Sequence, residues 1–196
     1  GSAFQIAEIT SMNQGVLGPY LAYLYKAISI PPGQPTGTFP TLLNAPDNPV
    51  THKLDWEVIS FLGVKYVLCP VSYTSFRAEL MKAGMHAVFE TDRVAVYENP
   101  SALPRAFGVS IPGQREASDV ELPKGFRSAL HPVKIGVYRN AEVVLTGVAD
   151  RPQMVVLSDN WHVNWMVSLN NSSARIVRIN GVFRGVWVEA GSYTIE

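Results

Sequence analysis

Aromatic and polar side chains that could contact a ligand gather near the C-terminal end of the sequence. Trp161 and Trp165 lie four residues apart, and Asp159 and His162 stand close to the first tryptophan. An exposed indole among such polar groups can stack on a sugar ring. The alternating residues 164–169 instead predict a strand that buries Trp165 in a core, with Trp161 packed in the preceding loop. We expect the core arrangement and keep Asp159, Trp161 and His162 as candidate ligand contacts.

Two arginines interrupt apolar stretches of the sequence. Arg184 stands in "VFRGVWV", and Arg105 stands in "ALPRAF". A guanidinium in such surroundings usually pairs with a carboxylate or stacks on an aromatic ring, so we expect a structural role for each arginine. The functional alternative is contact with an anion or a pyrophosphate. Arg105 and Arg184 are therefore the remaining candidate ligand contacts.

Common catalytic and metal-binding patterns do not occur in this sequence. His52, His86, His131 and His162 form neither H-x-H nor H-E-x-x-H spacing. No G-x-S-x-G elbow is present, and "GQPTGT" lacks the lysine of a phosphate-binding loop. We therefore assign no catalytic residue, no metal ligand and no cofactor. The chain is expected to bind, position or shield a partner.

The composition predicts a folded chain with a lightly charged surface. Hydrophobic residues make up 47% and charged residues 16%, and the net charge is zero because Lys+Arg and Asp+Glu both number 16. A nucleic-acid partner is not expected, since no basic surplus exists. Cys69 is the single cysteine and stands in an apolar run, which predicts a buried, inert thiol. The apolar runs fall short of the ~20 residues of a membrane span, and Gly1–Ser2 are expected to be a cloning remnant.

The first half of the sequence predicts a small α/β subdomain over residues 3–102. We expect strands over 3–10, 64–70, 85–92 and 93–100, helices over 18–30, 51–63 and 74–84, and a loop over 31–49. Thr51 is the expected N-cap of the second helix, and Thr74 or Ser75 that of the third. Gly63 and Gly84 are expected to end these helices.

From residue 103 the pattern changes to short strands separated by turn residues. Asn140–Ala141, Asn170–Asn171 and Asn180–Gly181 mark three of these turns, because asparagine tolerates the left-handed conformation that tight hairpins need. This spacing predicts an antiparallel β-sandwich, jelly-roll or immunoglobulin-like, over residues 103–196. The expected fold class of the whole chain is α+β.

Three segments resemble a known family when they are taken in order. They are "FLGVKYVLCP", "VYENPSALPRAF" and "VVLSDNWHVNWMVSLNNSSARIVRINGVFRGVWVEAGSYTIE". Together they resemble the C-terminal soluble region of the YfhO-like bacterial membrane proteins, which are themselves similar to GT-C glycosyltransferases. The matching positions are Gly63–Leu68, Tyr97–Asn99, Leu103–Phe107, Trp165, Asn180, Phe183–Val186 and Ala190–Gly191. Val163–Asn164 replaces the usual Pro-Gly, and Asn170–Asn171 replaces an Asp-Gly turn.

The resemblance implies a polytopic parent protein that transfers a sugar from a polyprenyl-phosphate carrier to an acceptor outside the cytoplasmic membrane. Its catalytic acidic residue would lie in a loop between early membrane spans, so the resemblance assigns none to this chain. It also implies that the chain stops where the family continues toward another span.

The function expected from the resemblance is that of a non-catalytic extracytoplasmic domain at the cell membrane. It would help to recognise the acceptor or cap the membrane active site. Its partners would be its own transmembrane region and a glycan or cell-envelope acceptor. The alternatives are a structural or protein-interaction β-sandwich module and a carbohydrate-binding module. A stand-alone enzyme is the least favoured, and would combine His162 or His131 with Asp159 or Glu189.

Overall fold

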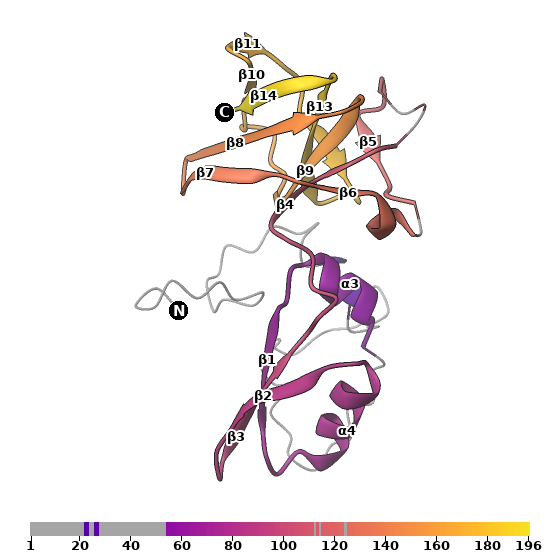
Figure 1. Ribbon diagram of the computed structural model, residues 1–196, viewed down its shortest axis with the longest axis vertical. Helices are drawn as coiled ribbons and strands as arrows, with labels where there is room; N and C mark the ends of the chain where they lie inside the picture. The colour runs from indigo at the N-terminus through magenta and orange to yellow at the C-terminus, as the bar shows by residue number, and fades with distance from the viewer. Residues whose placement is uncertain (1–21, 24–25, 28–53, 112, 114, 124) are drawn as a thin grey trace. The chain divides into compact units, whose positions relative to one another are not determined.

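The computed structural model describes residues 22–23, 26–27, 54–111, 113, 115–123 and 125–196 (Figure 1). The fold class is α+β, as predicted. Contacts divide the chain into two compact units, Gly1–Leu103 and Pro104–Glu196, where the sequence suggested a boundary after residue 102. The predicted strand over 3–10 and the loop over 31–49 lie outside the described residues. None of the described helices is long and apolar enough to cross a membrane.

The first unit contains a three-stranded antiparallel sheet. Its elements are α3 (Trp56–Phe61), β1 (Tyr66–Pro70), α4 (Thr74–Lys82), β2 (His86–Glu90) and β3 (Val94–Glu98), and the strand order is β1-β3-β2. Leu80 of α4 packs on Cys69, Ala95 and Tyr97, so the helix covers one face of the sheet (Figure 1). Cys69 is fully buried, which confirms the prediction from its apolar run.

The helix starts in this unit differ from those predicted. Asp55 is the N-cap of α3, and its Oδ1 accepts hydrogen bonds from the backbone N–H groups of Glu57 and Val58 at 3.1 Å. A carboxylate at this position satisfies two free donors and favours the positive end of the helix dipole, whereas Thr51 lies outside the described residues. Tyr73 precedes α4 without a side-chain cap, so the prediction of Thr74 or Ser75 was wrong. The predicted helix ends are confirmed, because Gly63 and Gly84 follow the helices with left-handed φ values of 73° and 86°.

The second unit is a β-sandwich of two stacked sheets (Figure 1). The five-stranded sheet has the order β11-β10-β14-β8-β7, and the six-stranded sheet has the order β5-β12-β13-β9-β4-β6. The strands are β4 (Ala106–Val109), β5 (Asp119–Val120), β6 (Leu130–Pro132), β7 (Lys134–Arg139), β8 (Glu142–Ala149), β9 (Gln153–Asn160), β10 (Ser168–Leu169), β11 (Ser172–Ser173), β12 (Val177–Ile179), β13 (Phe183–Val188) and β14 (Gly191–Ile195). The 3-10 helix η2 (Phe126–Ala129) precedes β6. Strand pairs are antiparallel except β12 with β5.

The core of the sandwich lies between the two sheets. It is built from aliphatic side chains of both layers and one tyrosine: Ala106, Leu145, Ala149, Val155, Leu157, Val186, Val188, Tyr193 and Ile195. Alternation along β9 and β13 places every second residue on this inner face. Asn170, Asn171 and Asn180 have φ values of 51°, 63° and 48°, which confirms the left-handed conformation predicted for two of the turns.

The prediction of a strand over residues 164–169 was wrong. Only Ser168 and Leu169 belong to β10, and residues 161–167 follow an irregular path after β9. The backbone N–H of Trp165 donates to the carbonyl of His162 at 3.1 Å, which turns the chain there. Trp165 is therefore not a core residue: it is half-buried, and its indole lies over the guanidinium of Arg184.

Candidate functional site

The carboxylate of Asp159 is the centre of a polar cluster in the sandwich. Arg105 Nη1 donates to Asp159 Oδ1 at 2.7 Å, and Arg184 Nη2 donates to Oδ2 at 2.9 Å. The hydroxyl of Tyr138 lies 2.9 Å from each oxygen. Charge-assisted bonds of this kind are shorter and stronger than neutral ones. We name Arg105, Tyr138, Asp159 and Arg184 the Asp159 cluster.

The sheets explain why these residues meet. Asp159 is the last residue but one of β9, and Arg105 directly precedes β4, the antiparallel neighbour of β9. Arg184 lies on β13, the other neighbour of β9, where a bulge shifts the register between Phe183 and Arg184. Such a bulge redirects the side chain that follows it. Tyr138 comes from β7 in the facing sheet, so the Asp159 cluster connects the two layers of the sandwich.

Arg184 is a charged side chain in largely apolar surroundings. Its relative exposure is 9%, and the centre of its guanidinium lies 4.1 Å from the centroid of the Trp165 ring. Burial lowers the pKa of this guanidinium, and the negative charge of Asp159 partly opposes that shift. Nη2 bonds to Asp159, whereas the buried Nε has no hydrogen-bond partner among the described residues. Arg184 therefore retains hydrogen-bonding capacity that no described residue uses.

Tyr138 remains a neutral hydrogen-bond donor over the ordinary pH range. Burial raises the pKa of its hydroxyl, the adjacent Asp159 charge raises it further, and the charge of Arg105 opposes both. The Arg105 guanidinium also lies 5.7 Å from the centroid of the Tyr138 ring. With two guanidiniums and one carboxylate, the Asp159 cluster carries a net charge of +1. Its carboxylate accepts hydrogen bonds from three side chains, so it fixes the positions of Arg105, Arg184 and Tyr138 relative to one another.

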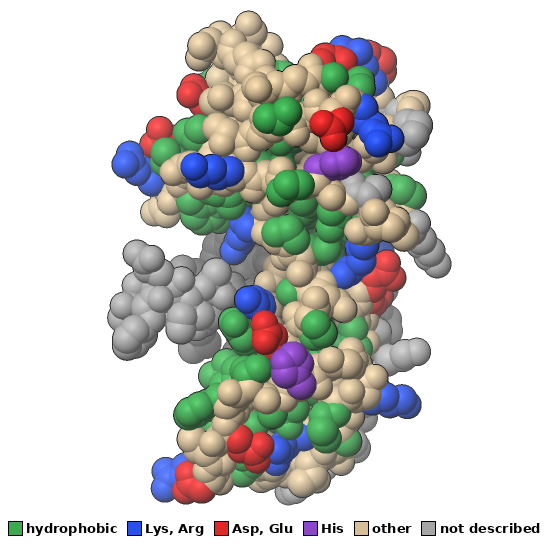
Figure 2. All heavy atoms as spheres, viewed as in Figure 1, with side chains coloured by type: hydrophobic (Ala, Val, Ile, Leu, Met, Phe, Trp, Pro, Cys, Tyr) green, Lys and Arg blue, Asp and Glu red, His purple; other side chains and the backbone are tan. Residues whose placement is uncertain are grey.

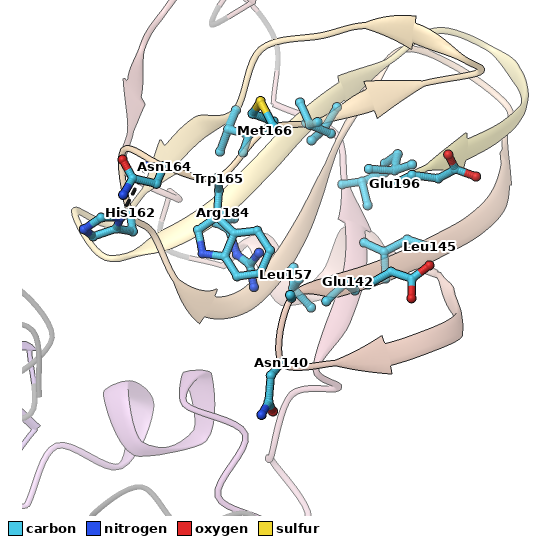
Figure 3. Close-up of a pocket in the computed structure, with 17 residues that line it drawn as sticks. Asn140, Glu142, Leu145, Leu157, His162, Asn164, Trp165, Met166, Arg184 and Glu196 are labelled. Carbon is cyan, nitrogen blue, oxygen red and sulfur yellow. Dashed lines mark hydrogen bonds between the residues drawn. The ribbon is translucent and has the colours of Figure 1, made fainter. Parts of the chain in front are cut away.

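A pocket of about 480 Å³ lies next to this cluster, within the sandwich. Most of its lining is aliphatic and comes from both sheets, and it includes Val143, Leu145, Leu157 and Val186. Figure 3 shows Trp165 drawn over Arg184 on one side of the pocket, with His162 and Asn164 beside them. Glu142 and Glu196 lie toward the other side (Figure 3). The pocket thus has apolar walls, one cationic end and one acidic end.

The structure brings together three of the five residues that the sequence singled out. Asp159, Arg105 and Arg184 form one cluster, and the carboxylate partner expected for each arginine is Asp159. His162 lines the pocket, and its Nδ1 accepts a hydrogen bond from the backbone N–H of Asn164 at 3.2 Å. Trp161 does not line the pocket. It lies under Arg178, whose guanidinium centre is 5.2 Å from its ring centroid.

Sequence reasoning missed Tyr138 and misplaced Trp165. Tyr138 lies on a strand of the opposite sheet with no local feature that marks it, so only the pairing of the two layers reveals its role. Trp165 carried a signal, its spacing from His162, but the alternating pattern around it favoured a core strand. This pocket does not gather the combination expected for an enzyme, since it is lined by His162 but not by His131, Asp159 or Glu189. Within the described ranges, no group of three or more His, Cys, Asp or Glu side chains could hold a metal ion.

The fold and the site define an antiparallel β-sandwich with an interlayer pocket and a charged cluster at one end of that pocket. No protein family, curated protein or solved structure matches the chain in a comparison with each. The pocket and the residues that reach it are the features of this chain that point to a function.

Proposed function

We propose that the sandwich is a non-catalytic binding domain of a membrane-bound parent protein, which holds an acceptor on the extracytoplasmic side for a glycosyltransferase similar to the GT-C enzymes. The observation that carries this proposal is the pocket of about 480 Å³, with Arg184 and Trp165 at one end. Its volume falls in the usual range for small-molecule sites. Its lining, which is mainly apolar with a few polar groups, is also typical of such sites.

The residues of the family resemblance support a role for this pocket. Arg105, Trp165 and Arg184 belong to three separate groups of matching positions, and all three belong to the Asp159 cluster or contact it. Tyr97 and Asn99, in a fourth group of matching positions, have structural roles in the first unit. Tyr97 is fully buried, and Asn99 Nδ2 donates to Ser60 Oγ and to the carbonyl of Val64, each at 3.0 Å.

Binding and catalysis place different demands on a carboxylate. A general base needs a lone pair directed at its substrate. Asp159 instead accepts bonds from Arg105, Arg184 and Tyr138, and it does not line the pocket. The cluster would hold Arg184 and Trp165 in place, and these two side chains would contact the ligand. Such positioning favours recognition of an acceptor over its chemical conversion.

Titration of the chain with cell-envelope polymers and their fragments tests this function. We expect saturable binding that Trp165→Ala weakens at least about tenfold, which corresponds to about 1.4 kcal/mol. Trp161→Ala is the matched control, because that tryptophan lies outside the pocket and should leave the affinity unchanged. In the full-length parent, Arg184→Ala and Trp165→Ala should reduce sugar transfer. Absence of binding, together with unimpaired transfer by both parent variants, would defeat the proposal.

A structural or protein-interaction role is the second candidate, and one observation favours it. Large hydrophobic side chains are exposed on the sandwich, with Met166 at 88%, Val163 at 73% and Val148 at 67%. Figure 2 shows hydrophobic side chains distributed among charged ones over the face it presents. Exposed apolar side chains that cluster mark contact surfaces. Charged substitutions at Val163 and Met166 that abolish transfer without changing acceptor affinity would favour this candidate.

A further inference from the structure

The pocket has two features that restrict the chemistry of its ligand. Its walls are aliphatic, with Val143, Leu145, Leu157, Val167, Val186 and Ile195 among them. The pocket also has polar lining residues, but the apolar side chains outnumber them, as is usual in small-molecule sites. The body of the ligand that fits here is therefore apolar. Burial of such a body is favourable because its apolar surface leaves water.

The second feature is the unused hydrogen-bonding capacity of Arg184. The residue is nine-tenths buried and lines the pocket, and its buried Nε has no partner in the described part of the chain. A buried donor without a partner costs free energy, so an acceptor that reaches this guanidinium would gain more than an ordinary surface contact. Guanidinium matches a carboxylate particularly well because its planar fork can bond two oxygens.

The charges around the pocket favour an acidic group at the Arg184 end alone. Arg105 and Arg184 outnumber Asp159 there, which leaves a net charge of +1. Glu142 and Glu196 lie toward the other side (Figure 3), where they would repel an anion. Glu142 is also paired with Arg139 at 3.2 Å, so its charge is partly compensated. A ligand with one acidic head would consequently bind in a single orientation.

We propose that the pocket binds an apolar chain with a single carboxylate head, placing the carboxylate at Arg184 and the chain between the two sheets. This inference rests on the proposed binding role of the pocket and names the chemistry of the group it recognises. Trp165 would shield the ion pair from water on one side. Exclusion of water strengthens an ion pair, because the local dielectric constant falls.

Isothermal titration of the chain with decanoate, kept below its micelle-forming concentration, tests this inference. Decanol, decyltrimethylammonium and acetate are the comparison ligands. We expect decanoate to bind one to one, decanol at least about tenfold more weakly, and the cationic amphiphile and acetate not measurably. Equal affinity for decanol and decanoate, or preference for the cationic amphiphile, would overturn the assignment of the head group.

Two substitutions on strand β8 provide a matched pair that leaves the Asp159 cluster intact. Val143→Phe fills the pocket and should weaken decanoate binding at least about tenfold, whereas Val148→Phe changes an exposed side chain on the same strand and should not. Circular dichroism verifies that both variants fold. Decanoate binding that Val143→Phe leaves unchanged would place the ligand elsewhere and refute the site.

The outcomes separate this inference from the proposed function. Decanoate binding at the pocket without affinity for envelope polymers would support the ligand chemistry and contradict acceptor recognition. Polymer binding that is sensitive to Trp165→Ala, without decanoate binding, would support acceptor recognition and contradict the carboxylate-bearing chain.

Discussion

Arg105 and Arg184 donate to opposite oxygens of one carboxylate, that of Asp159, with N···O distances of 2.7 and 2.9 Å. The two arginines lie on either side of β9, and their shared partner is the last residue but one of that strand. Tyr138 adds a bond from the facing sheet. One side chain thus joins three neighbouring segments of one sheet to the other layer.

Asp159→Asn should destabilise the sandwich by about 3 kcal/mol, because the substitution leaves a buried guanidinium without its countercharge. The asparagine amide still fits, but it cannot balance the charge of Arg184, which is 9% exposed. Urea unfolding followed by tryptophan fluorescence measures this loss, since Trp161, Trp165 and Trp187 all lie in the sandwich.

Glu142→Gln is the control for this substitution. It removes the same charge from an exposed ion pair with Arg139. The side chain of Arg139 is 75% exposed and that of Glu142 is 52% exposed. Exposed pairs contribute about 0–1 kcal/mol. Equal losses in the free energy of unfolding for Asp159→Asn and Glu142→Gln would contradict the expectation that burial makes the Asp159 cluster more stabilising than an exposed ion pair.

The sequence predicted the architecture well because its signals are local. Alternating apolar residues, and asparagines at hairpin turns, predicted the strands of the sandwich, and Gly63 and Gly84 predicted two helix ends. A polar residue beside an apolar run also predicted that Arg105 and Arg184 would each need a partner. Their common partner and the contribution of Tyr138 depend on strand order, which no local pattern records.

Trp165 shows how a local pattern can favour the wrong structure. Residues 164–169 alternate as a strand would, but the chain turns at His162 and Trp165 before β10 begins. A buried guanidinium gains from an aromatic face, by about 2 kcal/mol when the pair is desolvated. The contact with Arg184 thus provides a tertiary interaction that the alternating pattern could not anticipate.

Gly185 is expected to tolerate no side chain. A methyl group there would approach Met154 Sδ at 2.7 Å and Ile179 Cδ1 at 2.8 Å, and both neighbours are fully buried. Gly185→Ala should therefore destabilise the sandwich by about 1–3 kcal/mol through overpacking. Gly136→Ala, on β7, is the control, because the nearest atom there is the carbonyl oxygen of Val144 at 3.8 Å. Thermal unfolding compares the two variants, and equal stability would show that the β12–β13 surface repacks freely.

Tyr193 should make the sandwich less stable at alkaline pH. Burial raises the pKa of its hydroxyl above the usual value of 10.0. Between pH 10 and the raised pKa the unfolded chain loses this proton while the folded chain keeps it, so the free energy of unfolding falls as pH rises. The slope from this one group reaches at most about 1.4 kcal/mol per pH unit. Below pH 10 the stabilisation is fully present.

Tyr193→Phe tests this source of alkaline sensitivity. The phenylalanine has no proton to lose, so the decline in stability above pH 10 should become shallower than in the unmodified chain. Urea unfolding at half-unit steps from pH 8 upward measures the two slopes. Parallel curves would assign the alkaline loss to other groups.

Asn99→Ala should destabilise the first unit by about 2–3 kcal/mol, because it leaves buried polar groups without partners. Asn99 is 3% exposed, its Nδ2 donates to Ser60 Oγ and the Val64 carbonyl, and its Oδ1 accepts from the backbone N–H of Ser101. These bonds join the end of α3 to the segment after β3. Asp92→Ala, at a side chain that is 86% exposed, is the control and should change stability by less than about 0.5 kcal/mol. Amide hydrogen exchange measures the effect by unit: faster exchange in β1 and β3 with unchanged protection in β9 and β13 is expected, and uniform loss of protection in both units would contradict a local role for Asn99.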